Sequence, residues 1–166
     1  ARWPHEHHEL AVHPGRIASR TLLLEVVNSC RLLPVAAHRP IELSPGTVSL
    51  EFTSDRTLLK RVLVNLVKNG LDAIAESGRS GGRVEIEVRR AGAEVLIAVS
   101  DNGPGVPESH RAQLFDAFFT TKPKGVGLGL SICRTIAAAH GGTLRYAQAE
   151  LGGSCFTLSL PLSFIG

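Results

Sequence analysis

Residues 56–76 read RTLLKRVLVNLVKNGLDAIAE and carry the clearest helical pattern in the chain. Apolar residues recur there every three or four positions, as they do on the buried face of an amphipathic helix. These residues are Leu59, Val62, Leu63, Leu66, Gly70, Ala73 and Ile74. Ser54 or Asp55 can cap the start of this helix, and the loop 77–82 ends it. The stretch therefore predicts a long helix that packs on a core.

The same helix carries a polar stripe opposite its apolar face. Asn65 and Asn69 are four residues apart, and Lys68 and Asp72 flank them. An amide oxygen suits Mg²⁺, which usually reaches a protein through one or two groups plus substrate phosphates. Lys68 could supply positive charge to the same phosphates. Taken alone, however, the stripe is more typical of a solvated helix face.

Strands are predicted on both sides of this helix, where apolar and polar residues alternate. Their expected ranges are 41–43, 48–52, 83–90, 94–100, 143–148 and 154–160. Further helices are expected at 21–38, 107–115 and 128–140, with Pro34 weakening the second half of the first. The first twenty residues predict irregular structure. This order is typical of an α/β two-layer sandwich, with helices on one face of a mixed sheet.

Length and composition narrow the class of protein. The 166 residues suit one globular domain plus an arm, and 43% of them are hydrophobic. The formal charge of +3 does not call for a nucleic-acid partner. The apolar runs fall short of the roughly 18–20 residues of a membrane span, so no membrane contact is expected. The chain holds no Met, even at position 1, which we interpret as a piece cut from a longer protein.

The cysteines do not indicate a metal site or a disulfide framework. Cys30, Cys133 and Cys155 are far apart, odd in number and without metal-ligand spacing. We interpret them as small buried or half-buried residues in a reducing compartment.

Asp101-Asn102-Gly103-Pro104-Gly105 follows directly on a predicted strand. Gly103 and Gly105 allow unusual backbone angles and the close approach of a flat ligand. A carboxylate at a strand end can accept a hydrogen bond from the exocyclic amine of adenine. By itself, this stretch is equally compatible with an ordinary turn.

A glycine-rich segment, GVGLGL at 125–130, leads into the helix expected at 128–140. Glycines at a helix start expose backbone N–H groups, which together with the helix dipole form an anion site. The segment is not a dinucleotide fingerprint, because no predicted strand leads into it. It is not a P-loop either, because the glycines are not followed by GK[ST]. Just before it, Phe115, Phe118 and Phe119 could anchor a lid, leaving Thr120, Thr121 and Lys122 to face a ligand.

Together and in this order, four stretches resemble the sequence boxes of the histidine-kinase ATP-binding domain. They are NLVKNGLDA (65–73), DNGPGV (101–106), LFDAFFTTK (114–122) and GVGLGLSICRTIAAAHGG (125–142). The similarity covers roughly residues 41–160, so we expect an N-terminal irregular arm and linker helix at 1–40 and an ATP-binding catalytic domain at 41–166. The resemblance implies a Bergerat-type sandwich, with about five strands and about three helices on one face, as in Hsp90-type chaperones.

The resemblance also implies roles for individual residues. Asn69 would bind Mg²⁺, Asn65 would support the metal or phosphate environment, and Asp101 would bind the adenine amino group. Candidate catalytic residues are Asn69, Lys68 and Lys122. Candidate nucleotide contacts are Asn65, Asn69, Asp72, Asp101, Gly103, Gly105, Val106, Phe115, Thr120, Thr121, Lys122, Gly125, Gly127, Leu128, Gly129 and Leu130. The implied reaction uses Mg²⁺-ATP and transfers the γ-phosphoryl group to a histidine.

The position of Asn65 separates related classes within the superfamily. ATP-hydrolysing relatives and anti-sigma serine kinases usually carry Glu four residues before the metal-binding Asn. Asn65 cannot act as that base, which favours transfer to a histidine, whose neutral imidazole is already nucleophilic. A degenerate regulatory nucleotide-binding module, or a related ATPase or serine kinase, remains the alternative.

The accepting histidine is expected elsewhere. His8-Glu9-Leu10 resembles the start of an acceptor box, but only some thirty residues separate His8 from Ile41, too few for two long helices. We therefore expect a separate dimerisation and phosphoacceptor domain as partner, and a response regulator as an indirect one. The expected location is the cytoplasm, either free or as part of a membrane-bound sensor.

Overall fold

The computed structural model describes residues 10–117 and 129–163. A five-stranded sheet with the strand order β2-β4-β5-β7-β6 forms one layer. Its strands are β2 (Ile41–Leu43), β4 (Val84–Ala91), β5 (Glu94–Asp101), β6 (Thr143–Gln148) and β7 (Ser154–Pro161). The sheet is mixed, because β2 runs parallel to β4 whereas the other pairs are antiparallel. The predicted α/β two-layer sandwich is confirmed.

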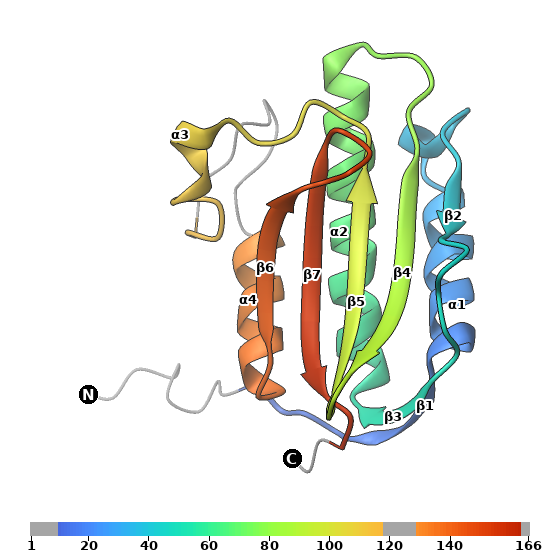
Figure 1. The fold of residues 1–166 in the computed structure, drawn as a ribbon, viewed down its shortest axis with the longest axis vertical. Helices are drawn as coiled ribbons and strands as arrows, with labels where there is room; N and C mark the ends of the chain where they lie inside the picture. Colours follow the sequence, from blue (N-terminus) through green and yellow to red (C-terminus); the bar gives the residue numbers. More distant parts are fainter. Residues whose placement is uncertain (1–9, 118–128, 164–166) are drawn as a thin grey trace.

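Three helices cover one face of this sheet (Figure 1). They are α1 (Ser19–Arg31), α2 (Arg56–Ser77) and α4 (Gly129–Ala139). The core lies between this helical layer and the sheet, and it contains alternate residues of β4, β5 and β7, such as Ile86, Ile97 and Leu158, none of which is exposed. The opposite face of the sheet is not covered by these helices.

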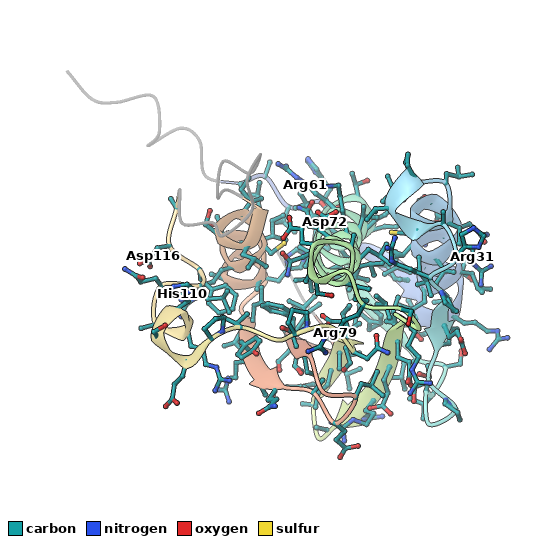
Figure 2. The ribbon with its side chains drawn as sticks, turned by 90° about the horizontal axis from the view of Figure 1, so that it is seen from above. Arg31, Arg61, Asp72, Arg79, His110 and Asp116 are labelled. Carbon is teal, nitrogen blue, oxygen red and sulfur yellow. The ribbon has the colours of Figure 1, made fainter. Side chains whose placement is uncertain are left out.

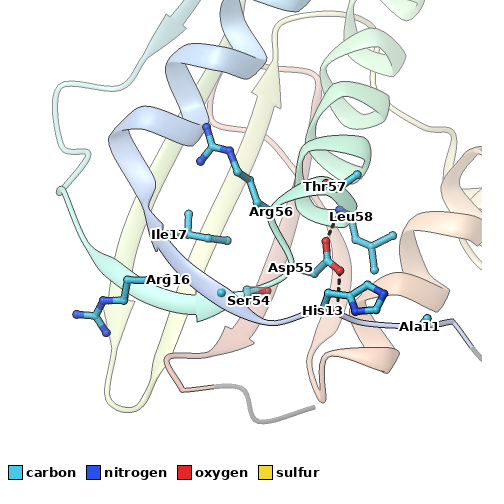
Figure 3. A pocket seen from close by; sticks show the side chains of 10 residues that line it. Ala11, His13, Arg16, Ile17, Ser54, Asp55, Arg56, Thr57 and Leu58 are labelled. Carbon is cyan, nitrogen blue, oxygen red and sulfur yellow. Dashed lines mark hydrogen bonds between the residues drawn. The ribbon is translucent and has the colours of Figure 1, made fainter.

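The long helix α2 lies where the pattern predicts it and ends one residue later. Asp55, rather than Ser54, caps it, because Asp55 Oδ1 accepts a hydrogen bond of 3.0 Å from the backbone N of Leu58 (Figure 3). Gly78 ends the helix with a φ of +70°, a left-handed conformation that glycine adopts without strain. The helix α2 packs against both α1 and α4.

The prediction of a helix over 21–38 is wrong at both ends. The helix begins at Ser19 and ends at Arg31, and Pro34–Ala36 forms a separate 3-10 turn. Proline lacks an N–H and forces the preceding residue out of the helical region, and Leu33 accordingly has a ψ of 136°. Pro34 therefore ends the helix rather than weakening it.

The first twenty residues are not irregular throughout. Gly15–Ala18 forms β1, which pairs antiparallel with β3 (Glu51–Ser54), three residues later than the strand expected at 48–52. The pairing joins segments about 35 residues apart, which no local pattern could indicate. The buried apolar side chains of α1 belong to the same hydrophobic cluster as those of the sheet. A division of the chain at residue 40 remains a prediction.

The last two predicted helices differ slightly from the structure. α3 is a single turn, Glu108–Arg111, followed by turns rather than by a helix to residue 115. α4 begins at Gly129 and ends at Ala139, one residue before the predicted end. Within 10–117 and 129–163, no helix is both long and apolar enough to cross a membrane.

Candidate functional site

Asp101 is the last residue of β5, and its carboxylate is held in a fixed orientation. The residue is only 4% exposed, and Oδ1 accepts backbone hydrogen bonds from Gly103 at 2.9 Å and Ser154 at 3.2 Å. Oδ2 accepts no hydrogen bond from the described residues. Burial raises the pKa of this carboxyl, although the two backbone hydrogen bonds act in the opposite direction. The arrangement leaves one oriented acceptor oxygen for a ligand.

Glycines surround this carboxylate because larger residues would displace it. A Cβ on Gly70 of α2 would lie 3.1 Å from Oδ2, and a Cβ on Gly103 would lie 3.1 Å from Oδ1. A Cβ on Gly153 would lie 2.2 Å from Oδ1, which no real structure tolerates. Gly153 was missed by sequence reasoning, although the Gly152-Gly153 pair between two predicted strands was a signal of close backbone approach.

The polar stripe of α2 is partly engaged within the protein. Asn65 and Asn69 are half-buried, whereas Lys68 is exposed and its Nζ donates to Asp72 Oδ2 at 3.1 Å. The thiol of Cys133 on α4 donates to the carbonyl oxygen of Val62 on α2 at 3.8 Å. Burial raises the pKa of that thiol to about 11, although the nearby side chain of Asn65 lowers it, so the thiol stays protonated at neutral pH. This part of α2 therefore lies against α4, a proximity that the sequence did not indicate.

The segment that follows Asp101 is attached to the sheet through aromatic side chains. Tyr146 on β6 accepts a hydrogen bond of 3.1 Å from the backbone N of Val106. The guanidinium of Arg111 lies 5.4 Å from the centre of the Tyr146 ring. Tyr146 was not among the predicted site residues, and a lone tyrosine on a strand gives no signal of this contact.

Phe115 also packs as expected of a residue that anchors a loop. Its ring meets Phe156 of β7 edge-on at 6.2 Å, and the guanidinium of Arg134 on α4 lies 5.0 Å from its centre. Gly129 and Leu130 form the first turn of α4. The remaining predicted contacts lie outside the described residues; they are Thr120, Thr121, Lys122, Gly125, Gly127 and Leu128.

The described residues fit a nucleotide and a magnesium ion in different ways. The oriented Oδ2 of Asp101 and the glycines around it form a cradle suited to a flat base with an amino group. Among residues 10–117 and 129–163, no group of three or more His, Cys, Asp or Glu side chains could hold a metal ion. Asn69 remains as a half-buried oxygen donor, which fits an ion held by one protein ligand plus substrate phosphates.

A separate pocket of about 360 Å³ lies at the other end of α2, roughly 20 Å along the helix from Gly70 (Figure 3). The segment 11–17 and the start of α2 line it, together with Ser54. This pocket does not include any of the predicted site residues.

Comparison with known proteins assigns the class. Residues 54–163 match the family of histidine kinase-, DNA gyrase B- and HSP90-like ATPases, and the chain belongs to this family. It is an ATP-binding catalytic domain of the histidine-kinase type, with the Bergerat-type fold that the sequence predicted.

The similar proteins are sensor kinases. The C4-dicarboxylate transport sensor protein DctS of Rhodobacter capsulatus is 46% identical over 109 residues, which are 66% of this chain and 17% of DctS. Sensor histidine kinase ZraS of Escherichia coli K12 is 37% identical over 125 residues, 70% of this chain and 26% of ZraS. The chain thus spans only about a fifth of the curated relatives it matches.

Solved structures agree with this assignment. The nucleotide-free catalytic domain of histidine kinase ThkA superimposes with a TM-score of 0.73 at 30% identity, covering 91% of this chain and 99% of that domain. The mycobacterial sensor histidine kinase MprB gives a TM-score of 0.76 at 23% identity over 93% of this chain and all of that chain, which shows the shared fold.

Proposed function

We propose that this domain binds Mg²⁺-ATP and transfers the γ-phosphoryl group to a histidine on a separate dimerisation domain, from which a response regulator later receives it. The observation that carries the proposal is the buried, oriented carboxylate of Asp101 at the end of β5. The family and the sensor-kinase relatives support ATP as the substrate. The domain is expected in the cytoplasm, the compartment that supplies ATP and response regulators.

At the adenine end, Oδ2 of Asp101 accepts a hydrogen bond from the exocyclic amine of the base. Gly103, Gly105 and Val106 form the adjoining wall. Gly105 has a φ of +75°, so the turn that carries this wall is strained for any other residue. A base without a donor at this position, such as guanine with its carbonyl oxygen, would face Oδ2 with a second acceptor and be rejected.

At the phosphate end, Asn69 would hold the magnesium ion through its amide oxygen, and Phe115 would anchor the start of the proposed lid. When bound, the ion neutralises phosphate charge during transfer. Lys68 contributes positive charge by exchanging its partner Asp72 for a phosphate oxygen. The other proposed contacts are Asn65, Thr120, Thr121, Lys122, Gly125, Gly127, Leu128, Gly129 and Leu130.

The choice of acceptor follows from Asn65. ATP-hydrolysing relatives place a Glu at this position as a base, whereas the neutral amide of Asn65 cannot remove a proton from water. A neutral histidine needs no such base. Its unprotonated ring nitrogen attacks the γ-phosphorus, the bond to the β–γ bridging oxygen breaks, and ADP leaves with that electron pair. The other ring nitrogen then releases its proton to solvent.

A transfer experiment tests the proposed function. The chain is mixed with γ-labelled ATP, Mg²⁺ and a separate dimerisation fragment of its parent kinase. We expect label on the fragment that is labile to acid and stable to base, as phosphohistidine is. Binding of ATP without labelled fragment would instead support a regulatory nucleotide-binding module, and rapid release of free phosphate would support an ATPase. The domain without the fragment should stay nearly unlabelled.

A further inference from the structure

The loop after β5 provides one of the two backbone hydrogen bonds that orient Asp101, because Gly103 N donates to Oδ1 at 2.9 Å and Ser154 N donates to the same oxygen at 3.2 Å. The position of Gly103 must therefore be secured from outside the loop. Its carbonyl oxygen accepts a hydrogen bond of 3.0 Å from Nη1 of Arg79, and the same nitrogen lies 3.5 Å from the carbonyl oxygen of Asn102. One guanidinium thus contacts two consecutive carbonyls of the loop.

The end of α2 directs Arg79 at this loop. Gly78 turns the chain out of the helix with its left-handed conformation. The backbone N of Arg79 then donates to Ser77 Oγ at 3.2 Å, and that hydroxyl donates to Ile74 O at 2.7 Å. Figure 2 shows Arg79 extending from the end of α2 toward the ends of the strands. The backbone of Arg79 is thus oriented before its side chain meets the loop.

Asn102 supports the same loop, but at a different residue. Its Oδ1 accepts from the backbone N of Arg83 at 2.7 Å, and its Nδ2 donates to Gly81 O at 2.9 Å. These bonds join Asn102 to the segment 78–83. They do not reach Gly103, whose carbonyl is held by Arg79. The two supports therefore act on neighbouring residues of one loop.

We propose that Arg79 is a positioning residue for nucleotide binding. Its guanidinium holds Gly103 in place and thereby keeps the Asp101 carboxylate oriented toward the adenine amino group. This inference rests on the proposed adenine contact of Asp101. The contacts of the Arg79 guanidinium are with loop carbonyls, so we expect its effect on nucleotide affinity and not on the transfer step.

The location of Arg79 makes a specific prediction about nucleotides. ADP and ATP share the adenine and differ only at the γ-phosphate. Loss of Arg79 should therefore weaken the binding of ADP and of ATP by the same factor. Loss of a residue that contacts the phosphates, as proposed for Lys68, would weaken the binding of ATP more than the binding of ADP.

The test compares three variants of the 166-residue chain in calorimetric titrations with Mg-ADP and Mg-ATP. Arg79→Ala should weaken both nucleotides about tenfold, the effect of losing a charge-assisted hydrogen bond at a partly exposed position. Arg79→Lys should lose less, since an ammonium can still donate to one carbonyl. Arg90→Ala is the matched control, because Arg90 Nε donates to Gly92 O at 3.0 Å in the hairpin at the opposite end of β5; its affinities should equal those of the wild type.

Hydrogen exchange of the Gly103 amide provides a second measurement, independent of nucleotide. This amide should exchange faster in Arg79→Ala, and in Arg79→Lys if the alanine variant does not fold. Wild-type exchange in a variant that lacks the guanidinium would contradict the proposal. So would a loss of affinity confined to ATP.

Asp101→Asn separates this inference from the function on which it rests. If Asp101→Asn abolishes binding while Arg79→Ala binds normally, Arg79 has no positioning role and the adenine contact of Asp101 stands. If both variants bind as the wild type does, the adenine contact itself is wrong. If both lose affinity and Arg90→Ala does not, both proposals are supported.

Discussion

At the scale of single residues, Asp101 combines a functional orientation with an unfavourable charge. Two backbone N–H groups fix its Oδ1, while burial removes most of the water that would stabilise the ionised form. The raised pKa means that folding favours the protonated carboxyl. A buried carboxyl with a raised pKa is expected at a position where binding of a ligand, and not stability of the fold, requires an aspartate.

Asp101→Asn should therefore separate stability from binding. The unfolded chain ionises Asp101 near the ordinary pKa of about 3.9, and the folded chain does so at higher pH. Wild-type stability should fall, relative to the variant, as pH rises from the unfolded pKa through the folded pKa, and then stay constant. Urea denaturation across this range measures the difference. At neutral pH we expect the variant to be at least as stable as the wild type.

The same variant should bind ATP at least a hundredfold more weakly, because an amide N–H₂ would face the adenine amine as a second donor. Calorimetric titration measures this loss. Wild-type affinity would show that the carboxylate does not contact the base. A variant less stable than wild type at neutral pH would contradict the assigned cause of the pKa shift.

At the scale of elements, Asp55 joins three segments at the start of α2. Its two carboxylate oxygens accept from the backbone N of Leu58 at 3.0 Å and of His13 at 2.8 Å, both drawn in Figure 3. Its own N–H donates at 3.3 Å to Nε2 of His140, the residue after α4. The cap of α2 therefore also attaches the N-terminal segment and α4.

Asp55→Ala should lower the free energy of unfolding by about 1–2 kcal/mol, the usual cost of an N-cap. Asp55→Asn keeps an acceptor oxygen and should lose less. Thr57→Ala, one residue into the helix, is the neighbouring control and should change stability little. Equal stability of Asp55→Ala and wild type in urea denaturation would show that the cap contributes nothing.

The pH dependence of stability gives a second test of Asp55. Burial alone would raise the pKa of the Asp55 carboxyl. The opposing effects are larger, and they come from the backbone hydrogen bonds of His13 and Leu58 and from the charges of His140 and His13. The net shift of the pKa is therefore downward. A carboxyl whose pKa is lower in the folded chain than in the unfolded chain stabilises the fold while it is ionised. This stabilisation is fully present above the pKa of the unfolded chain and is lost as pH falls through the pKa of the folded chain. This acid loss should be smaller in Asp55→Asn than in the wild type.

At the scale of the whole molecule, α1 completes the core between helices and sheet. Leu22, Leu23, Val26, Val27 and Cys30 are at most 3% exposed. Burial of an apolar side chain of this size contributes about 1.5–3 kcal/mol, so the group contributes roughly 10 kcal/mol. That amount is comparable to the entire stability of an ordinary domain, about 5–15 kcal/mol.

Removal of residues 1–40 should therefore abolish cooperative unfolding, since α2 would lose the helix that packs on it. Circular dichroism during thermal denaturation measures this. As a control, the shorter deletion of residues 1–9 should unfold cooperatively. A chain of residues 41–166 that unfolds as sharply as the full chain would support a domain boundary at residue 40.

Local patterns explain which parts of the fold and site were predictable. The 3.6-residue period of 56–76 and the alternation in 83–90 and 94–100 report burial along one element, and burial is what orders each element. Asp101 was identifiable only through the order of the four boxes, because a carboxylate before a glycine-rich turn is by itself compatible with an ordinary turn. Contacts between distant segments leave no such period. Arg79, Tyr146 and Gly153 were missed because each acts on a residue at least 24 positions away.

The sequence by itself determined the class of this protein: the order of its four boxes, the long helix α2 and the carboxylate that ends β5. Only the tertiary structure decided how that carboxylate is oriented, that residues 15–18 form a strand with 51–54, and that Cys133 of α4 contacts Val62 of α2. The physical reason is the range of the interactions. Hydrophobic periodicity and turn residues involve neighbours in the sequence, so the sequence shows them directly. The orientation of a side chain depends on hydrogen bonds and packing between segments that meet only after folding.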